Sequence, residues 1–399
     1  MGKRLIIVLV GYKVKEFDFL RFDAREFEDK EGIKVHFHEL VDYLNPGFSK
    51  MFSKTYISEQ IKKFNEFNEW KKEIINNKKE FGEKILIINE IQNHSFKSLK
   101  INYLLKKIKI KSIYFSNFDH PSNSSLQTSY KISWLIKNIF FNQKKLKIFL
   151  ESKISSILEN LLGLKKEFFF KSGQNSNKEE KKLCTKVIHG HSRDYNMHLK
   201  MKNIKFERND NYGLFLESAT PVHNKGDSFI TGDDANFRGT PNNWLNSIKN
   251  FFDTIEKKLK IKILIVPHPK IKHPDRNSKL YGGREILSSP LSLAAKNARL
   301  IISRDSQGSS FAAIYKLPGI FIYNNELKFL KNNFLLNQKK FANSFGLEPI
   351  NIDEKLDDNK LKKALYFENR NYENYIKEYL TSRNDNKFNY QIISETFNF

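Results

Sequence analysis

The chain has 399 residues, of which 39% are hydrophobic, and a formal net charge of +24 from 69 Lys and Arg against 45 Asp and Glu. This length favours two domains, and the apolar content excludes a chain that is disordered for most of its length. The single cysteine, Cys184, excludes an internal disulfide framework and a Cys-only metal site. The charge favours anionic partners such as nucleic acid, a membrane surface or phosphorylated substrates, although a generally Lys-rich surface also explains it.

The first half of the chain alternates predicted strands with predicted helices. Apolar or alternating runs predict strands over 5–10, 32–40, 85–88, 112–115 and 186–189, and helical patterns cover 53–79, 98–107 and 126–162. This rhythm predicts a doubly wound parallel sheet. The helical stretch 126–162 is basic and amphipathic. We expect its apolar side to face the core, with a membrane surface as the alternative.

Candidate functional residues of the first half follow its predicted strands. The strand over 112–115 leads to Asp119-His120-Pro121, at the edge where such sheets bind ligands. We assign Asp119 to general-base catalysis and His120 to acceptor binding, with loop capping by Asp119 as the alternative. His189 and His191 stand near Asp194, but two histidines without a clear third ligand are weak evidence for a metal, and we predict none.

The second half repeats the alternation from about Arg208 onward. Strands are predicted over 212–217, 260–266, 298–302 and 319–323, with a helix over 243–259. We therefore divide the chain into an N-terminal domain (1–207), a C-terminal domain (208–370) and a C-terminal segment (371–399). The long loop 218–241 is of a length that usually serves function. Its His223 is a candidate to bind the acceptor, Asp233 and Asp234 are further candidates, and Glu217 precedes the loop as a candidate catalytic carboxylate.

A histidine between two prolines ends the predicted strand over 260–266. The sequence there is Pro267-His268-Pro269-Lys270, and the prolines stop the strand and stiffen the backbone around His268. A histidine held in this way can donate a hydrogen bond to a phosphate oxygen, and Lys270 adds positive charge. Arg284 and Ser288 follow in the same region and are assigned to the same nucleotide site.

A serine-rich stretch follows the next predicted strand. Ser303–Ser310 leads directly into a helical pattern, and a helix N-terminus offers free N–H groups to an anion. We assign Ser306, Gly308, Ser309 and Ser310 to phosphate binding, since one N-cap would need only one of these hydroxyls. The sequence has no P-loop, no Gly-x-Gly-x-x-Gly fingerprint and no Gly-x-Ser-x-Gly elbow. Nor does it have a recognisable nucleic-acid-binding motif.

These motifs form an ordered set between Tyr212 and Tyr323. The set is Leu214-Phe215-Leu216-Glu217, Pro221-Val222-His223, Val266-Pro267-His268-Pro269-Lys270, Tyr281-Gly282-Gly283-Arg284, Ser306–Ser310 with Ala312-Ala313, and Leu317-Pro318-Gly319-Ile320. It resembles bacterial surface-polysaccharide glycosyltransferases of the GT-B type. The His-Pro and Ser-rich pair is similar to the CMP-binding motifs of GT-B sialyltransferases and Kdo transferases. The resemblance implies an α/β, GT-B-like fold with two Rossmann-like domains facing a central cleft, of which 1–207 would bind the acceptor and 208–370 the nucleotide-sugar donor.

The resemblance also implies roles for single residues. In those relatives the histidine of His-Pro and the serines contact the nucleotide phosphate, which carries over to His268, Ser309 and Ser310. Their general base lies in an acidic-acidic-glycine motif, of which Asp29-Lys30-Glu31-Gly32 is only a loose copy. Asp119 and Glu217 therefore stay the candidates. In many GT-B proteins the last helix crosses back to the first domain, which this sequence leaves open.

We expect a metal-independent glycosyltransferase whose only cofactor-like ligand is its nucleotide-sugar donor. The donor would be a CMP-linked nonulosonic or ulosonic acid, and the glycan or lipid-linked acceptor would belong to a capsule, O-antigen or lipooligosaccharide. The alternatives are a UDP-sugar-using transferase or epimerase of the same fold, and a non-catalytic protein that binds nucleic acid or anionic lipid. We expect a cytoplasmic protein, at most peripheral on the inner membrane face, with no specific nucleic-acid partner.

Overall fold

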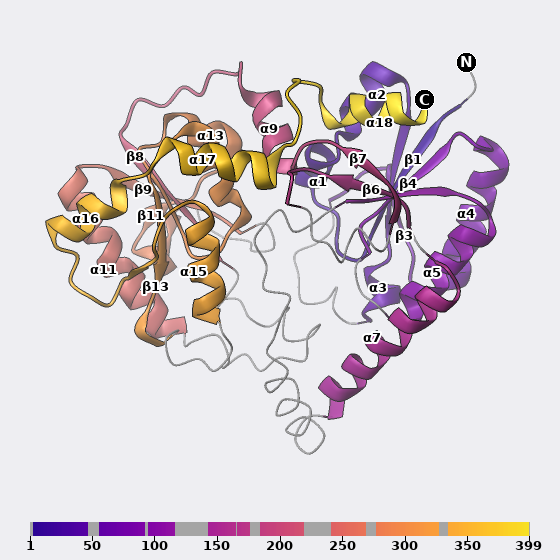
Figure 1. Cartoon of the computed structure of the whole chain (residues 1–399), viewed down its shortest axis with the longest axis horizontal. Helices are drawn as coiled ribbons and strands as arrows, with labels where there is room; N and C mark the ends of the chain where they lie inside the picture. Colours follow the sequence, from indigo (N-terminus) through magenta and orange to yellow (C-terminus); the bar gives the residue numbers. More distant parts are fainter. Residues whose placement is uncertain are drawn as a thin grey trace.

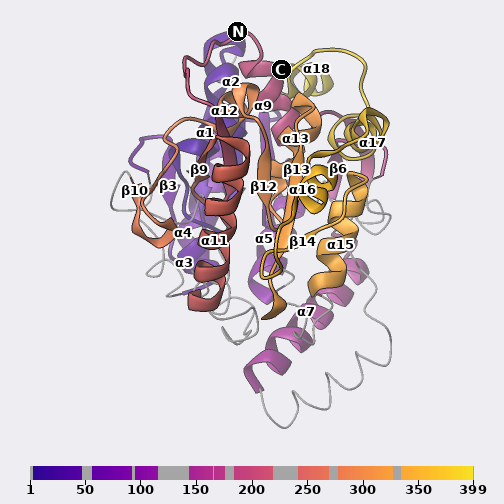
Figure 2. The ribbon, with the colours of Figure 1, turned by 90° about the vertical axis from the view of Figure 1, so that its left-hand side faces the viewer.

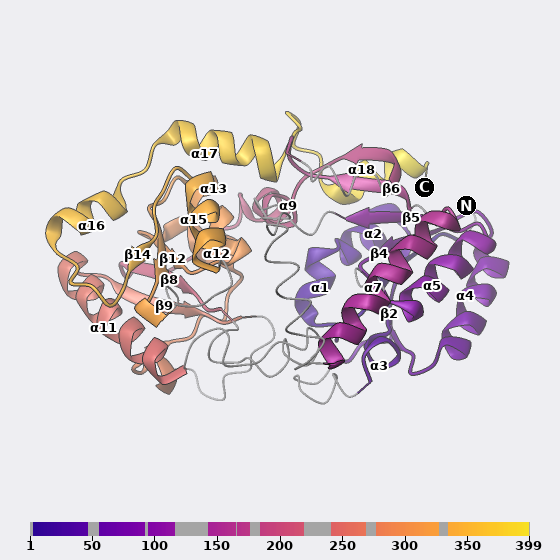
Figure 3. The same ribbon diagram turned by 60° about the horizontal axis from the view of Figure 1, so that its bottom comes forward.

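The computed structural model describes residues 3–46, 56–91, 95–115, 143–164, 166–175, 184–218, 241–268, 277–326 and 334–398. These residues form two α/β domains, each built on a parallel sheet, which lie side by side (Figure 1; Figure 3). The expected α/β architecture with two Rossmann-like domains is confirmed. None of the described helices is both long and apolar enough to span a bilayer.

The first domain carries seven parallel strands in the order β3-β2-β1-β4-β5-β6-β7. The chain moves outward from β1 to β3, returns to the other side of β1 at β4, and continues to β7, so the strand order reverses between β1 and β4. Every residue of β1 is buried, as its continuous apolar run predicts. The strands are β1 (Leu5–Val10), β2 (Lys34–Glu39), β3 (Ile61–Lys63), β4 (Ile85–Asn89), β5 (Lys111–Phe115), β6 (Lys166–Lys171) and β7 (Cys184–His189).

Helices cover both faces of this sheet, and their caps and apolar stripes explain where they form. In α4, the buried residues Trp70, Ile74 and Phe81 recur at helical spacing, and the Trp70 indole donates to Nδ1 of His38 at 3.2 Å. In α5, the Ser95 hydroxyl accepts from the Ser98 backbone and caps the first turn. The helices are α1 (Glu16–Arg21), α2 (Ala24–Glu31), α3 (Val41–Leu44), α4 (Phe67–Phe81), α5 (Phe96–Lys107) and α7 (Gln143–Leu161).

The second domain carries five parallel strands in the order β14-β13-β12-β8-β9. The chain runs from β8 to β9 on one side and then to β12 on the other, so here the order reverses between β8 and β12. The strands are β8 (Tyr212–Leu216), β9 (Lys262–Val266), β12 (Ile301–Ser303), β13 (Gly319–Tyr323) and β14 (Ile350–Asn351), and a small ribbon adds β10 (Asn277–Ser278) and β11 (Arg284–Glu285).

The helices of this domain pack on both sides of its sheet (Figure 2). The buried stripe of α11 joins the core with the residues that its spacing predicts: Trp244, Ile248, Phe251, Phe252 and Ile255. The helices are α11 (Pro241–Leu259), α12 (Leu291–Ala294), α13 (Ser310–Tyr315), α15 (Phe334–Ser344), α16 (Asp358–Leu365) and α17 (Asn369–Tyr375), with single turns at Lys279–Tyr281, Ala295–Asn297 and Gln307–Ser309.

Two segments connect the domains: α9 (Arg193–Met201) on the way out, and the C-terminal residues on the way back. After α17 and a π-helical turn (Ile376–Leu380), the chain returns to place α18 (Asn389–Phe397) beside α2 (Figure 1). Tyr390 and Ile393 join the core of the first domain. The return passes so close to Gly173 that a Cβ there would lie 2.0 Å from the Glu378 carbonyl oxygen.

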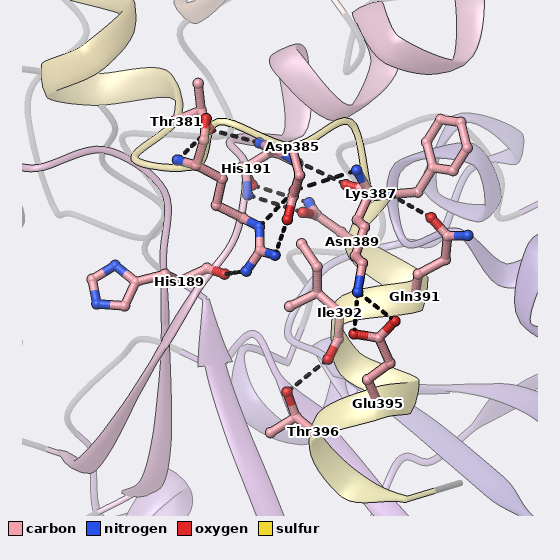
Figure 4. Close-up of polar contacts among 12 residues, drawn as sticks. His189, His191, Thr381, Asp385, Lys387, Asn389, Gln391, Ile392, Glu395 and Thr396 are labelled. Atoms are coloured by element: carbon pink, nitrogen blue, oxygen red, sulfur yellow. Dashed lines mark hydrogen bonds and ion pairs between the residues drawn. The ribbon is translucent and has the colours of Figure 1, made fainter.

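His191 fastens this returning segment to the end of β7 (Figure 4). Its Nδ1 lies 2.7 Å from the Thr381 hydroxyl, and its Nε2 lies 2.9 Å from the Lys387 carbonyl oxygen. The amide of Asn389 completes the junction, because it accepts from the His191 backbone N–H and donates to the His191 carbonyl, both at 3.0 Å. The last helix is thus held by buried hydrogen bonds as well as by apolar packing.

Candidate functional site

The carboxyl ends of three strands of the second sheet bring polar residues together. Glu217 directly follows β8, and Arg304 directly follows β12. His268 follows β9 after one intervening residue, Pro267. Ligands of doubly wound sheets bind at the carboxyl edge where the strand order reverses, and that point lies between β8 and β12. We therefore place the candidate site at this edge.

Glu217 is buried and organises the backbone and side chains around it. Its Oε2 accepts the backbone N–H of His268 at 3.1 Å, and its own N–H donates to the Val266 carbonyl at 3.0 Å. The pKa of Tyr281 is well above its usual range because of burial, and the negative charge of Glu217, which accepts from the Tyr281 hydroxyl, raises it further. Glu217 therefore holds the end of β9, and with it His268, through two hydrogen bonds: one from the His268 N–H and one to the Val266 carbonyl.

Arg304 is a buried cation at the same edge. Its guanidinium carbon lies 5.6 Å from the centre of the Trp244 ring, and its carbonyl accepts from the Gln338 amide at 2.9 Å. Its positive charge acts against the burial that raises the pKa of Tyr281, so Arg304 and Glu217 both act on that hydroxyl. A buried arginine needs compensating anions. Asp305 supplies one carboxylate at 3.4 Å from Arg304 Nε.

Within the stretch Ser303–Ser310, some serine hydroxyls form hydrogen bonds with described residues and one does not. Ser303 Oγ accepts the backbone N–H of Ser306 at 3.0 Å, and Ser310 Oγ donates to Oδ2 of Asp194 at 2.7 Å. Ser309 Oγ is buried and has no hydrogen-bond partner among the described residues. Because buried hydroxyls are nearly always paired, Ser309 has hydrogen-bonding capacity that a ligand oxygen could satisfy. The fit of Gly308 is tight, since a Cβ there would lie 2.5 Å from Leu291 Cδ2.

Other residues that the sequence assigns to this site are placed differently. Arg284 lies beside the start of β9, where it pairs with Asp253 and Glu256 of α11 at 2.5 and 2.6 Å, so the structure does not bring it to the strand ends. Ser288 is exposed and lies near the end of β9. The residue before it, Leu287, donates its backbone N–H to the Ile265 carbonyl in that strand. The remaining candidates lie outside the described residues: Asp119, His120, His223, Asp233, Asp234, Pro269 and Lys270.

The start of α9 adds two residues that the sequence analysis did not assign. Arg193 pairs at 2.5 Å with Glu90, which follows β4 at the point where the first sheet reverses its order. The next residue, Asp194, accepts from Ser310, 116 positions away in the sequence. Burial raises the pKa of Asp194, and the Ser310 hydrogen bond lowers it in part. Consecutive residues of the linker helix thus contact the functional edges of both sheets.

The histidines considered as metal ligands have other partners. Nδ1 of His189 lies 3.2 Å from the Ser382 hydroxyl, and His191 and Asp194 make the separate contacts given above. Within the described parts of the chain, no group of three or more His, Cys, Asp or Glu residues is arranged to hold a metal ion.

No family model matches the sequence, and no curated protein matches it. Solved structures with a similar fold include a glycotransferase of kitacinnamycin (10% identity, 99% of both chains, TM-score 0.49). They also include the wall teichoic acid polymerase TagF (10% identity, 99% of this chain and 88% of that chain, TM-score 0.48). A third is the UDP-GlcNAc 2-epimerase from Methanocaldococcus jannaschii (13% identity, 99% of this chain and 100% of that chain, TM-score 0.47). These values are too low to assign an activity to this chain.

Proposed function

We propose that the protein is a nucleotide-sugar-dependent glycosyltransferase whose donor binds at the carboxyl edge of the second sheet. The observation that carries the proposal is that His268 follows β9 while Arg304 and Ser309 follow β12, so that they lie on the two sides of β8 at the carboxyl edge of the sheet. A cation, a histidine and an unpaired hydroxyl form a donor set suited to a phosphate group. Glu217 holds the backbone of His268 and accepts from the Tyr281 hydroxyl.

The same set would stabilise the leaving group of glycosyl transfer. In that reaction the bond between the anomeric carbon and the phosphate oxygen breaks, and the acceptor oxygen forms a new bond to the anomeric carbon. Negative charge develops on the departing phosphate, where Arg304, His268 and Ser309 would stabilise it without reorganisation. The proton of the acceptor hydroxyl passes to a general base. We propose Asp119 for that role, since the contacts of Glu217 suit it better to positioning His268.

We propose a CMP-linked sugar as the donor, in particular a nonulosonic or ulosonic acid destined for a surface glycan. This choice is supported by the similarity of the His-Pro and Ser-rich pair to CMP-binding motifs. A UDP-sugar-using transferase or epimerase is the alternative of the same fold. The protein's own cations would neutralise the phosphate charge, so the proposal requires no divalent metal.

A thermal-shift screen of CMP-, UDP- and GDP-linked sugars tests the proposal. A ligand at 100 times its Kd stabilises the folded protein by about 2.7 kcal/mol, which raises the Tm of a chain of this length by roughly 3 °C. We expect one nucleotide class to produce this shift in the wild type and not in the His268→Ala or Ser309→Val variant. Arg284→Ala is the matched control, because it removes a cation of the same domain outside the strand ends, and its shift should match the wild type.

Product analysis separates the two enzyme classes. A transferase releases the nucleotide at an appreciable rate only when an acceptor is present, whereas an epimerase converts the sugar nucleotide without one. A wild-type protein that is stabilised by none of these sugar nucleotides, or an Arg284→Ala variant that loses the shift while His268→Ala retains it, would contradict the proposed site.

A further inference from the structure

Helix α7 turns an apolar stripe away from the protein. Leu150, Ile154, Ile157 and Leu161 are 46%, 46%, 58% and 77% exposed. Their spacing of four, three and four residues places them on one side of the helix. Figures 1 and 3 show α7 on the outside of the first domain, next to α5. The sequence analysis expected the apolar side of this stretch to face the core, and for these four residues the structure shows the reverse.

The polar side of α7 is the side that contacts the protein. Glu151 accepts the backbone N–H of Phe96 at 3.0 Å, and Glu159 accepts from the Asn102 amide at 3.1 Å. Ser155, between them on the same side, is fully buried. Lys106 of α5 donates to the carbonyls of residues 162 and 163 just beyond the helix. The helix is therefore attached to α5 by polar contacts, and its apolar side is left outward.

The outward side of α7 is also cationic. The helix contains four lysines and two glutamates, and both glutamates are bonded to α5. Lys147 and Lys153 are exposed, and the ammonium of Lys153 lies 5.7 Å from the centre of the Phe149 ring. The neighbouring α5 adds exposed Phe96 and Tyr103. An apolar stripe flanked by lysines, with its carboxylates turned inward, is the pattern of a helix that lies in a membrane interface.

We propose that this face, made of Leu150, Ile154, Ile157 and Leu161 with Lys147 and Lys153, docks on an anionic lipid surface. The apolar side chains would enter the boundary between headgroups and acyl chains, and the lysines would contact lipid phosphates. A second copy of the chain is a poorer partner. It would bring the lysines of two helices together, between molecules that each carry a net charge of +24. The inference stands apart from the proposed function, because lipid binding is measured without any sugar nucleotide.

Co-sedimentation of the full chain with vesicles tests this surface. We expect the wild type to bind vesicles of phosphatidylcholine mixed equally with phosphatidylglycerol, and to bind vesicles of phosphatidylcholine alone much more weakly. Ile157→Gln with Leu161→Gln should weaken binding to the anionic vesicles roughly tenfold or more. Leu336→Gln is the matched control, because Leu336 is an exposed apolar residue of another helix, α15. It should bind like the wild type.

A second pair of variants separates local charge from total charge. The first double variant is Lys147→Glu with Lys153→Glu, on α7, and the second is Lys202→Glu with Lys205→Glu, away from it. Both change the net charge of the chain equally, and all four lysines are exposed. We expect roughly thirtyfold weaker binding for the α7 pair, at about 1 kcal/mol for each of its two lysines near the surface, and a smaller effect for the other pair. All of these positions are exposed, so thermal unfolding should stay near that of the wild type.

Three results would overturn the inference. The first is a wild-type chain that does not bind the anionic vesicles. The second is binding that the two lysine pairs reduce equally, which would indicate only the overall charge. The third is a dimer in light scattering that the α7 variants dissociate while vesicle binding is absent, which would assign the stripe to a second copy of the chain.

Discussion

Acid should destabilise this protein through the neutral histidine at the junction of the returning segment. His191 is buried, and burial lowers its pKa to about 4, although the hydrogen bond to the Lys387 carbonyl opposes that change. The carbonyl requires a hydrogen on Nε2, so Nδ1 accepts from Thr381 in the neutral tautomer. Protonation at Nδ1 would place a second N–H against the Thr381 hydroxyl and a positive charge inside the protein.

The sign and the size of the effect follow from the two pKa values. The unfolded chain takes up the proton below about pH 6.5, whereas the folded chain takes it up only below about pH 4. The stability is therefore fully present above pH 6.5 and is lost as the pH falls toward 4. At about 1.4 kcal/mol for each unit of pKa, the loss amounts to about 3 kcal/mol. Burial also lowers the pKa of His36, His38 and His198, which adds loss in the same direction.

Urea unfolding at a series of pH values from about 7.5 to about 4.5 measures the effect, and a variant isolates the share of His191. His191→Gln retains one donor and one acceptor but cannot gain a charge. It should be less stable than the wild type by about 1 kcal/mol near neutral pH, and should lose about 2–3 kcal/mol less between the two ends of the series. His189→Gln, at an exposed position two residues earlier, should follow the wild type. Parallel curves for His191→Gln and the wild type would refute this reasoning.

Three further changes test contacts in and around the site. Gly173→Ala would drive a Cβ against the Glu378 carbonyl and should cost about 2–4 kcal/mol in urea unfolding, while an unchanged midpoint would contradict the close approach. Ser310→Ala leaves the Asp194 carboxylate buried without its hydrogen bond and should lower the free energy of unfolding by about 1–3 kcal/mol. Adding Asp194→Asn should restore part of that loss. If the losses from the two substitutions simply add, the two side chains do not stabilise each other. Arg304→Ala should cost about 2–4 kcal/mol, because it empties buried space beside the Trp244 ring and removes the cation–π contact with it, whereas an unchanged midpoint would mean that this packing contributes little.

The strands that the sequence predicts best are those buried on both faces. Runs such as Leu5–Val10 and Gly319–Tyr323 are apolar throughout because helices cover both sides of each sheet. Five strands were missed: the two-residue strands β10, β11 and β14, and the strands β3 and β6 of the first sheet. β3 is a three-residue edge strand, Ile61–Lys63, with one apolar residue, and it lies in a charged stretch that resembles a helix. β6 has three consecutive phenylalanines between charged residues, a run too short to be assigned by periodicity.

The site was predictable only where the chain itself brings residues to a strand end. Glu217 and His268 could be found because Glu217 directly follows one apolar run and His268 follows another after Pro267 alone. Arg304 was passed over, since its burial depends on Trp244 from another element of the fold. The outward side of α7 was missed for a related reason. Periodicity shows that a helix has two unlike sides, but the side that contacts the protein is decided by partners such as Phe96 and Asn102 on a neighbouring helix.

Two consecutive residues at the start of α9, Arg193 and Asp194, contact the carboxyl edges of the two sheets. Arg193 contacts Glu90 at the edge of the first sheet, and Asp194 contacts Ser310 at the edge of the second. Ser310 directly follows Ser309, the buried hydroxyl that lacks a partner among the described residues. A ligand that binds Ser309 therefore acts one residue away from a contact that ties the second domain to the linker helix. Because the preceding residue of that helix, Arg193, is bonded to the first domain, a shift of α9 at this point displaces both contacts together.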